Sequence, residues 1–113
     1  MVDLEKVQHI YIFPGMTDMR LGIFGLRKLI IEIATLETNS LYIFCSRNRN
    51  QVKLIETTES STWLYQNKLV HGKFLWPTIG EKSELSKDQL RMIIEGAGLV
   101  GSIETKGKKI AFF

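Results

Sequence analysis

The sequence has a single cysteine, Cys45, and two histidines, His9 and His71. One cysteine cannot form a disulfide within the chain, and a cysteine inside an apolar run is typical of a structural thiol in a reducing compartment. Two histidines and one cysteine at these spacings do not make a metal site. The sequence therefore predicts a protein that needs no metal ion and no cofactor.

Long apolar runs are also missing. No run reaches the roughly 18–20 residues that a membrane-spanning helix requires. The N-terminal stretch MVDLEKVQHI is acidic and mixed, unlike a secretory signal. We therefore expect a cytoplasmic protein with no membrane contact, and the 113 residues suit a single domain, 1–113.

The patterns of catalytic sites are absent as well. The acidic residues show no motif for the metal ions that phosphodiester hydrolysis requires. There is no Ser-His-Asp order, no glycine-rich phosphate loop and no zinc spacing. The sequence predicts a protein that is not an enzyme.

What the chain does have is a region rich in β-branched and aromatic residues, residues 40–77. Its apolar residues follow no helical period, and polar turns interrupt them; Asn48 and Asn50 tolerate the left-handed conformation that a tight turn needs. Such short connections favour a meander of antiparallel strands, which Pro77 would end because proline has no amide to donate. The predicted strands are residues 40–45, 51–57, 63–66 and 73–76.

A strand and a helix are expected before this region. Residues 8–13 have strand character and end at a Pro-Gly turn pair. The helix is expected from Asp18 to Leu36, with Thr17 or Asp18 as its N-cap. Its apolar residues at helical spacing are Ile23, Leu26, Ile30 and Ile33.

A second helix is expected after it, from Leu85 to Gly96. Ser86 is the predicted N-cap, and Gln89 three residues later completes a capping box. Leu85 and Leu90 stand at the positions of a hydrophobic staple. The predicted fold class is α+β: a mostly antiparallel sheet, one long helix packed on it, and this C-terminal capped helix.

The sheet region also carries the positive charge. The net charge is +3, and the stretch from Arg47 to Lys53 holds three cations and no acid. Cations that approach phosphates displace condensed counterions, so such a patch is a general footprint of nucleic-acid binding. The alternative is a solvated hairpin face whose cations blunt exposed strand edges. The candidate nucleic-acid-binding residues are Arg20, Arg47, Arg49, Lys53, Lys68 and Lys73.

Arg20 enters this set for a separate reason. In the first turn of a helix a cation is unfavourable, unless a nearby anion or carboxylate compensates its charge. The carboxylate of Asp18 is one group that could do this, and a phosphate anion would be another. A structural role for Arg20 is the favoured interpretation.

Four aromatic residues lie in the second half of the sheet region: Trp63, Tyr65, Phe74 and Trp76. Trp63 and Tyr65 share one face of their strand, so both are buried or both exposed. Aromatic residues on a sheet can stack on unpaired bases. The favoured interpretation is that all four form the core under the first helix.

Four blocks of the sequence resemble successive blocks of one bacterial family: TDMRLGIFGLRKLI, LYIFCSRNRNQVKLI, WLYQNKLVHGKFLWP and LSKDQLRMIIEG. The family is that of the small accessory proteins, usually called TnpB, encoded by the second open reading frame of insertion-sequence-sixty-six-type transposable elements. The resemblance covers about residues 8–97. Relatives usually carry a Trp-Asp-Gly-type turn where this chain has residues 56–61, ETTESS, and residues 98–113 form an extension with a predicted hairpin.

The resemblance implies a non-catalytic accessory role in DNA transposition, with DNA and the element's other transposition proteins as partners. Two functions stay open. One is nucleic-acid binding through the basic hairpin. The other is a protein-interaction adaptor with no nucleic-acid affinity, using exposed apolar surface such as Phe112 and Phe113. Salt dependence of DNA binding separates them, because only the first releases counterions.

Overall fold

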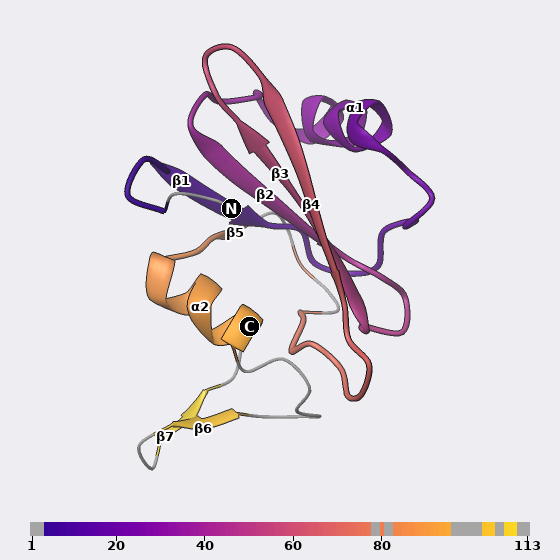
Figure 1. The fold of residues 1–113 in the computed structure, drawn as a ribbon, viewed down its shortest axis with the longest axis vertical. Helices are drawn as coiled ribbons and strands as arrows, with labels where there is room; N and C mark the ends of the chain where they lie inside the picture. Colours follow the sequence, from indigo (N-terminus) through magenta and orange to yellow (C-terminus); the bar gives the residue numbers. More distant parts are fainter. Residues whose placement is uncertain (1–3, 78–79, 81–82, 96–102, 106–107, 111–113) are drawn as a thin grey trace.

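A mixed five-stranded sheet forms the centre of the molecule (Figure 1). The structure is a computed structural model that describes residues 4–77, 80, 83–95, 103–105 and 108–110. Its elements are β1 (His9–Ile12), α1 (Ile23–Ile33), β2 (Ser40–Cys45), β3 (Gln51–Thr57), β4 (Thr62–Lys68), β5 (Ser83–Glu84), α2 (Lys87–Glu95), β6 (Ile103–Thr105) and β7 (Lys108–Ile110).

The strand order in the main sheet is β4-β3-β2-β1-β5. Strands β2, β3 and β4 form the predicted antiparallel meander. Strand β1 pairs with β2 in parallel, because the chain crosses over through α1 between them. Strand β5 pairs antiparallel with β1 and forms the other edge of the sheet. The α+β prediction is confirmed, with one parallel pair that the sequence did not indicate.

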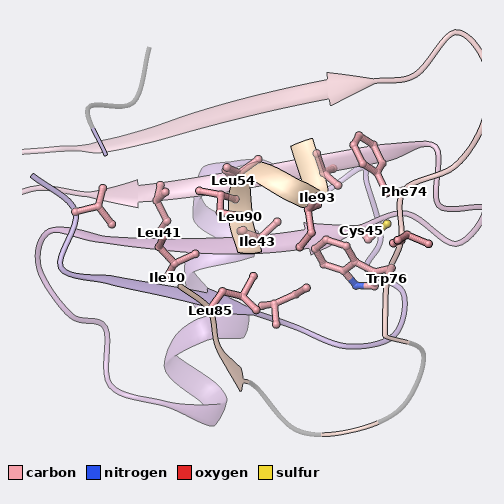
Figure 2. Close-up of a cluster of buried hydrophobic side chains, with 14 residues drawn as sticks. Ile10, Leu41, Ile43, Cys45, Leu54, Phe74, Trp76, Leu85, Leu90 and Ile93 are labelled. Atoms are coloured by element: carbon pink, nitrogen blue, oxygen red, sulfur yellow. The ribbon is translucent and has the colours of Figure 1, made fainter. Parts of the chain in front are cut away.

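The two helices lie on opposite faces of this sheet, and each covers its own core. Alternate residues of a strand point to opposite faces, so Ile10 and Ile43 join one cluster while Tyr11 and Tyr42 join the other. The first cluster includes Leu90 of α2 (Figure 2). The second cluster contains Leu26 and Ile30 of α1. All residues of β2 are buried, which explains its uninterrupted apolar sequence.

The start of α2 confirms the predicted capping box. The Gln89 amide donates to Ser86 Oγ at 3.1 Å, and the Ser86 amide donates to Gln89 Oε1 at 2.9 Å. Leu85 and Leu90 are both buried in the same cluster, as a hydrophobic staple requires. Gly96, where this helix is predicted to end, lies outside the described residues.

Helix α1 is shorter than the sequence predicted. It begins at Ile23 instead of Asp18 and ends at Ile33 instead of Leu36. Its N-cap is Gly22, with no side-chain cap hydrogen bond. The predicted capping by Thr17 or Asp18 is wrong, because residues 17–20 belong to a loop that bonds to other parts of the fold.

Residues 73–76, predicted as a fourth strand of the meander, form no strand. Phe74, Leu75 and Trp76 are nevertheless buried. Their side chains belong to the cluster that faces α2, so Phe74 and Trp76 are core residues as favoured, but on the face opposite α1. The indole Nε1 of Trp76 donates to the carbonyl oxygen of Phe13 at 2.9 Å.

The ETTESS segment forms a turn in which the Thr58 amide donates to the Ser61 carbonyl at 2.9 Å. The Ser61 amide in turn donates to Thr58 Oγ1 at 3.0 Å, so a hydroxyl side chain stabilises this turn. Strands β6 and β7 pair antiparallel with each other, as the predicted hairpin requires. Phe112 and Phe113 lie outside the described residues.

Candidate nucleic-acid interface

The turn between β2 and β3, residues 46–50, is organised by Ser46. The Ser46 amide donates to the Gln51 carbonyl at 2.9 Å, and the Arg49 amide donates to the Ser46 carbonyl at 3.0 Å. The Gln51 amide donates to Ser46 Oγ at 3.1 Å. The left-handed residue is Arg49, with φ of 62°, and neither of the two asparagines. The turn is therefore a fixed platform for its arginines.

Two later segments hold this turn from outside the hairpin. The Phe74 amide donates to the Arg49 carbonyl at 2.7 Å, and the Leu69 amide donates to the Asn50 carbonyl at 2.7 Å. Because Phe74 is fully buried, the bond at Arg49 ties the turn to the core. The exposed side chain of Arg47 stands on a backbone that is fixed on both sides.

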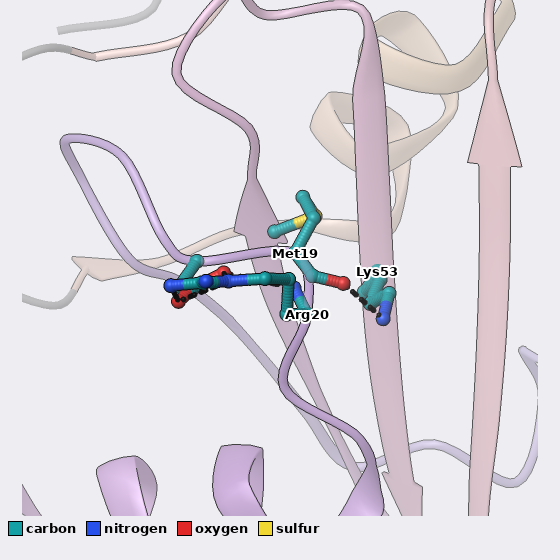
Figure 3. A network of polar contacts seen from close by, with 4 residues as sticks. Met19, Arg20 and Lys53 are labelled. Atoms are coloured by element: carbon teal, nitrogen blue, oxygen red, sulfur yellow. Dashed lines mark hydrogen bonds and ion pairs between the residues drawn. The ribbon is translucent and has the colours of Figure 1, made fainter.

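The loop that precedes α1 forms a second wall beside the turn. The Thr17 amide donates to the Cys45 carbonyl at 2.8 Å. The ammonium of Lys53 donates to the carbonyl oxygen of Met19 at 2.7 Å (Figure 3). It also donates to the carbonyl oxygen of Leu21 at 2.9 Å. These bonds place residues 16–20 next to the β2–β3 turn although the two segments are about thirty residues apart in sequence.

Asp18 and Arg20 form an ion pair within this loop. Arg20 Nη2 lies 2.7 Å from Asp18 Oδ2, and the Arg20 amide donates to Asp18 Oδ1 at 2.9 Å. These hydrogen bonds lower the pKa of Asp18 to about 2. The carboxylate is therefore ionised at neutral pH and already engaged. The Arg20 side chain is 90% exposed, so its remaining donors face solvent.

Two hollows border the turn, and Arg47 lines both. The larger, of about 740 Å³, is lined by residues that include Asp18, Arg20, Arg47, Asn48 and Lys68. The smaller, of about 360 Å³, is lined by residues that include Met16, Arg47, Arg49 and Trp76.

Lys73 is exposed and precedes Phe74, whose amide bonds to the turn. We call the five cations of this region the basic surface: Arg20, Arg47, Arg49, Lys68 and Lys73.

Comparison with known proteins identifies the family. The family model described as "IS66 Orf2 like protein" matches residues 8–101. The chain belongs to this family. The chain is also 29% identical, over 90 residues, to an uncharacterized protein, y4hO, of Sinorhizobium fredii; the match covers 77% of this chain and 78% of that protein. No solved structure matches. Membership in the IS66 Orf2-like family associates the chain with transposition as an accessory protein of insertion sequences.

Five of the six cations that the sequence singled out lie in the basic surface of this family member. Lys53 does not. It is only 7% exposed, it points to the face that α1 covers, and its ammonium is bonded to two backbone carbonyls. Because a buried, engaged ammonium cannot reach a phosphate, Lys53 has a structural role in the loop and is left out of the basic surface.

The two aromatics proposed for base stacking lie away from the basic surface. Trp63 and Tyr65 share a face and stack with ring centroids 6.4 Å apart. Trp63 is 56% exposed, so the favoured interpretation of a core residue is wrong for it. The Tyr65 hydroxyl donates to Glu56 Oε1 at 2.7 Å. Glu56 and Glu59 line a hollow of about 490 Å³ beside Trp63. Carboxylates repel a polyanion, so this end of the sheet is unfavourable for nucleic acid.

Sequence reasoning missed several polar residues that line the candidate interface. Asn48, Asn50 and Gln51 line the larger hollow beside the arginines. The signal was present in the SRNRNQ segment, where amide side chains alternate with arginines. Amide and guanidinium groups are the side chains that pair with base edges. Met16, exposed at the rim of both hollows, had no comparable signal.

Within the part of the chain that the structure describes, no group of three or more metal-ligating side chains is close enough to hold a metal ion. No helix among the described residues has the length and apolar content to cross a membrane.

Proposed function

We propose that this IS66 Orf2-like protein is a non-catalytic accessory protein of DNA transposition that binds DNA through the basic surface. The observation that supports this most is convergence: cations from three separate segments meet around the β2–β3 turn. Arg20 comes from the loop before α1, Arg47 and Arg49 from the turn, and Lys68 from the end of β4. The only carboxylate lining the two hollows, among the described residues, is Asp18.

The chemistry of the basic surface suits a duplex backbone. Arginine offers a planar fork of donors that matches phosphate oxygens. The fixed turn limits the backbone freedom that would be lost on binding at Arg47, since this backbone is already ordered. The neighbouring amides of Asn48 and Asn50 would supply contacts to base edges.

The test is the salt dependence of binding to a labelled DNA fragment, followed by fluorescence anisotropy. We expect the logarithm of the association constant to fall linearly with the logarithm of salt concentration. Replacing both arginines of the turn, Arg47→Ala with Arg49→Ala, should lower the slope by about 0.9 for each lost phosphate contact. Stability should change by less than about 0.5 kcal/mol per site.

A matched control variant makes the same change in net charge by replacing two lysines outside the basic surface. Lys6 and Lys28 are exposed and line hollows other than the two of the basic surface. The variant Lys6→Ala with Lys28→Ala should keep the parent slope. If the turn variant binds DNA as the parent does, the basic turn is only a solvated edge and the proposal is wrong.

The outer side of α1 favours a second candidate, a protein-interaction adaptor. Phe24 is 83% exposed and Ile31 is 58% exposed, and both line a hollow of about 420 Å³ together with Arg27, Lys28 and Glu32. Exposed apolar residues gathered on one side of a helix are typical of protein contacts. If the parent shows no salt-dependent DNA binding, yet Phe24→Ser with Ile31→Ser lowers transposition in cells, the adaptor function is supported instead.

A further inference from the structure

The outer edge of β4 is a regular strand edge. Among the described residues β4 pairs with β3 alone, and it lies at the end of the strand order (Figure 1). Its seven residues contain no proline and no glycine, and its one charge, Lys68, is at the last position. Proteins normally protect free edges with short strands, prolines, bulges or inward charges. Strand β5 at the opposite edge is short, with two residues, whereas β4 has none of these devices, and the only charge on its edge is Lys68 at the last position.

The hydrogen bonds around β4 show which backbone groups face outward. The Leu69 amide donates to Asn50 and therefore points toward the β3 side. Backbone groups alternate in direction along a strand, so Asn67, Tyr65 and Trp63 also bond to β3. The amides and carbonyls of Thr62, Leu64, Gln66 and Lys68 consequently point away from the sheet.

We propose that β4 is the interface between two copies of this chain, paired antiparallel about a two-fold axis at Tyr65. In this register Leu64 lies opposite Gln66 of the second copy, and the outward backbone groups of these two residues exchange hydrogen bonds. Thr62 lies opposite Lys68 at each end. The two five-stranded sheets then form one continuous sheet of ten strands.

A second copy fits this edge because the strand is complementary to itself. The self-pairing places no like charges opposite each other, since Lys68 faces Thr62. Tyr65 meets its own equivalent, and Trp63 lies diagonal to Tyr65 of the other copy, within reach of an aromatic ring. The contact would cover part of Trp63, which is 56% exposed in the single chain.

The outer side of α1 is less suited to such a contact. Arg27 and Lys28 lie at the middle of its exposed side, and a two-fold helix pair would bring these cations against their own equivalents. The apolar residues of α1 therefore favour a different partner from the second copy.

One consequence rests on the proposed function. A two-fold axis perpendicular to the sheet reverses the strand direction, so the two basic surfaces lie at opposite ends of the dimer. If each binds DNA, the dimer holds two DNA segments at once. Self-association itself needs no DNA, so its test is independent of the DNA-binding proposal.

The first test compares two cysteine variants of the full chain without DNA. Across the axis, the two copies of residue 65 form a non-hydrogen-bonded pair with Cα atoms about 4.5 Å apart, which suits a disulfide. The two copies of residue 63 are four residues apart along the strands, about 14 Å. Cys45 is fully buried and does not take part.

With dissolved oxygen and a copper catalyst as oxidant, Tyr65→Cys should give a disulfide-linked dimer on a denaturing, non-reducing gel. Trp63→Cys should give only the unlinked single chain on the same gel. Cross-linking by random collisions between chains would instead favour Trp63→Cys, since residue 63 is the more exposed of the two. If Tyr65→Cys stays monomeric, or if both variants cross-link equally, the register is wrong. Light scattering on the unmodified protein at micromolar concentration should give the mass of a dimer, and a monomer mass would overturn the proposal.

The second test changes the charge at the ends of the interface. Thr62→Lys places a lysine opposite Lys68 twice in the dimer, and Thr62→Glu places a carboxylate there instead. We expect the dimer dissociation constant to rise with the lysine and fall with the glutamate, each by roughly two- to thirtyfold at low salt. Circular dichroism checks that both variants fold. Equal dissociation constants for the two folded variants would contradict the pairing of Thr62 with Lys68.

Discussion

Lys53 shows how much the placement of one residue changes the interpretation of a charged segment. The sequence places it two residues after the turn, in a stretch with three cations. The alternation of β3 turns it toward α1, the same face as Ile55, where its ammonium binds the carbonyls of Met19 and Leu21. The composition of a segment gives the number of its cations, but only the sheet register determines which face of the sheet each cation occupies.

A lysine-to-methionine pair of variants tests this difference. Lys53→Met keeps the apolar stem but leaves two carbonyls without their donor, so the free energy of unfolding should fall by about 1–3 kcal/mol. Lys68→Met, on an exposed residue, should change it by less than about 0.5 kcal/mol. Urea denaturation measures both. In DNA binding we expect the opposite ranking, in which only Lys68→Met lowers the salt slope. If the two variants lose equal stability, Lys53 does not have the structural role assigned to it.

His9 on β1 and Glu84 on β5 provide a pH-dependent contact between two strands. His9 Nδ1 lies 2.9 Å from Glu84 Oε2, and this hydrogen bond raises the pKa of His9 above 6.5. A raised pKa means that the folded state binds the proton more tightly, so the contribution to stability is present below pH 6.5. It is lost as the pH rises through the pKa of the folded state.

We expect Glu84→Gln to lower the pKa of His9 toward 6.5, because the charged partner is removed. A titration of the His9 ring protons by NMR measures this directly. Unchanged backbone amide shifts outside β1 and β5 would show that the fold is retained. An unaltered His9 titration in the variant would mean that the pair does not form in solution.

At the scale of elements, local chemical signals were the reliable ones. The bounds of β2 and β3 agree with the predicted strands. The capping box at Ser86 was predicted from two residues three positions apart. These features depend on neighbours in sequence, so a single chain contains the information that they need.

Ser86→Ala should destabilise the protein by about 0.5–2 kcal/mol, since the Gln89 amide then lacks its acceptor. The matched control is Ser60→Ala, a change of the same residue type in an exposed turn. Urea midpoints compare the two. If Ser86→Ala unfolds at the same urea concentration as Ser60→Ala, the side chain of Ser86 does not cap α2.

Elements set by distant contacts were the ones that sequence reasoning misplaced. Helical spacing extends from Asp18 onward, but Arg20 engages the Asp18 side chain and Thr17 bonds to β2. Residues 73–76 resemble a strand, yet the backbone and side chains of this segment contact the β2–β3 turn and the core. The basic surface follows the same rule: Arg47 and Arg49 were predictable, whereas the approach of Arg20 depends on how the chain crosses over the sheet.

At the scale of the whole molecule, the buried residues of both cores lie in the part of the chain that the family model covers, apart from Val7, one residue before the match. The buried residues of the two clusters run from Val7 to Ile93, and the family match ends at residue 101. Among the described residues, β6 and β7 pair with each other in a sheet of their own. Residues 102–113 carry three lysines and one glutamate, so their removal lowers the net charge from +3 to +1.

A chain ending at residue 101 should therefore keep its fold, with a free energy of unfolding within about 0.5 kcal/mol of the parent, because no described core residue is lost. It should also keep the parent's salt slope in DNA binding. The variant Arg47→Ala with Arg49→Ala has the same net charge of +1, since it also loses two cations. Its slope should fall by about 0.9 for each lost phosphate contact. If the shortened chain loses several kcal/mol, the tail packs on the core. If the two variants lose slope equally, DNA binding follows the net charge of the molecule and not the basic surface.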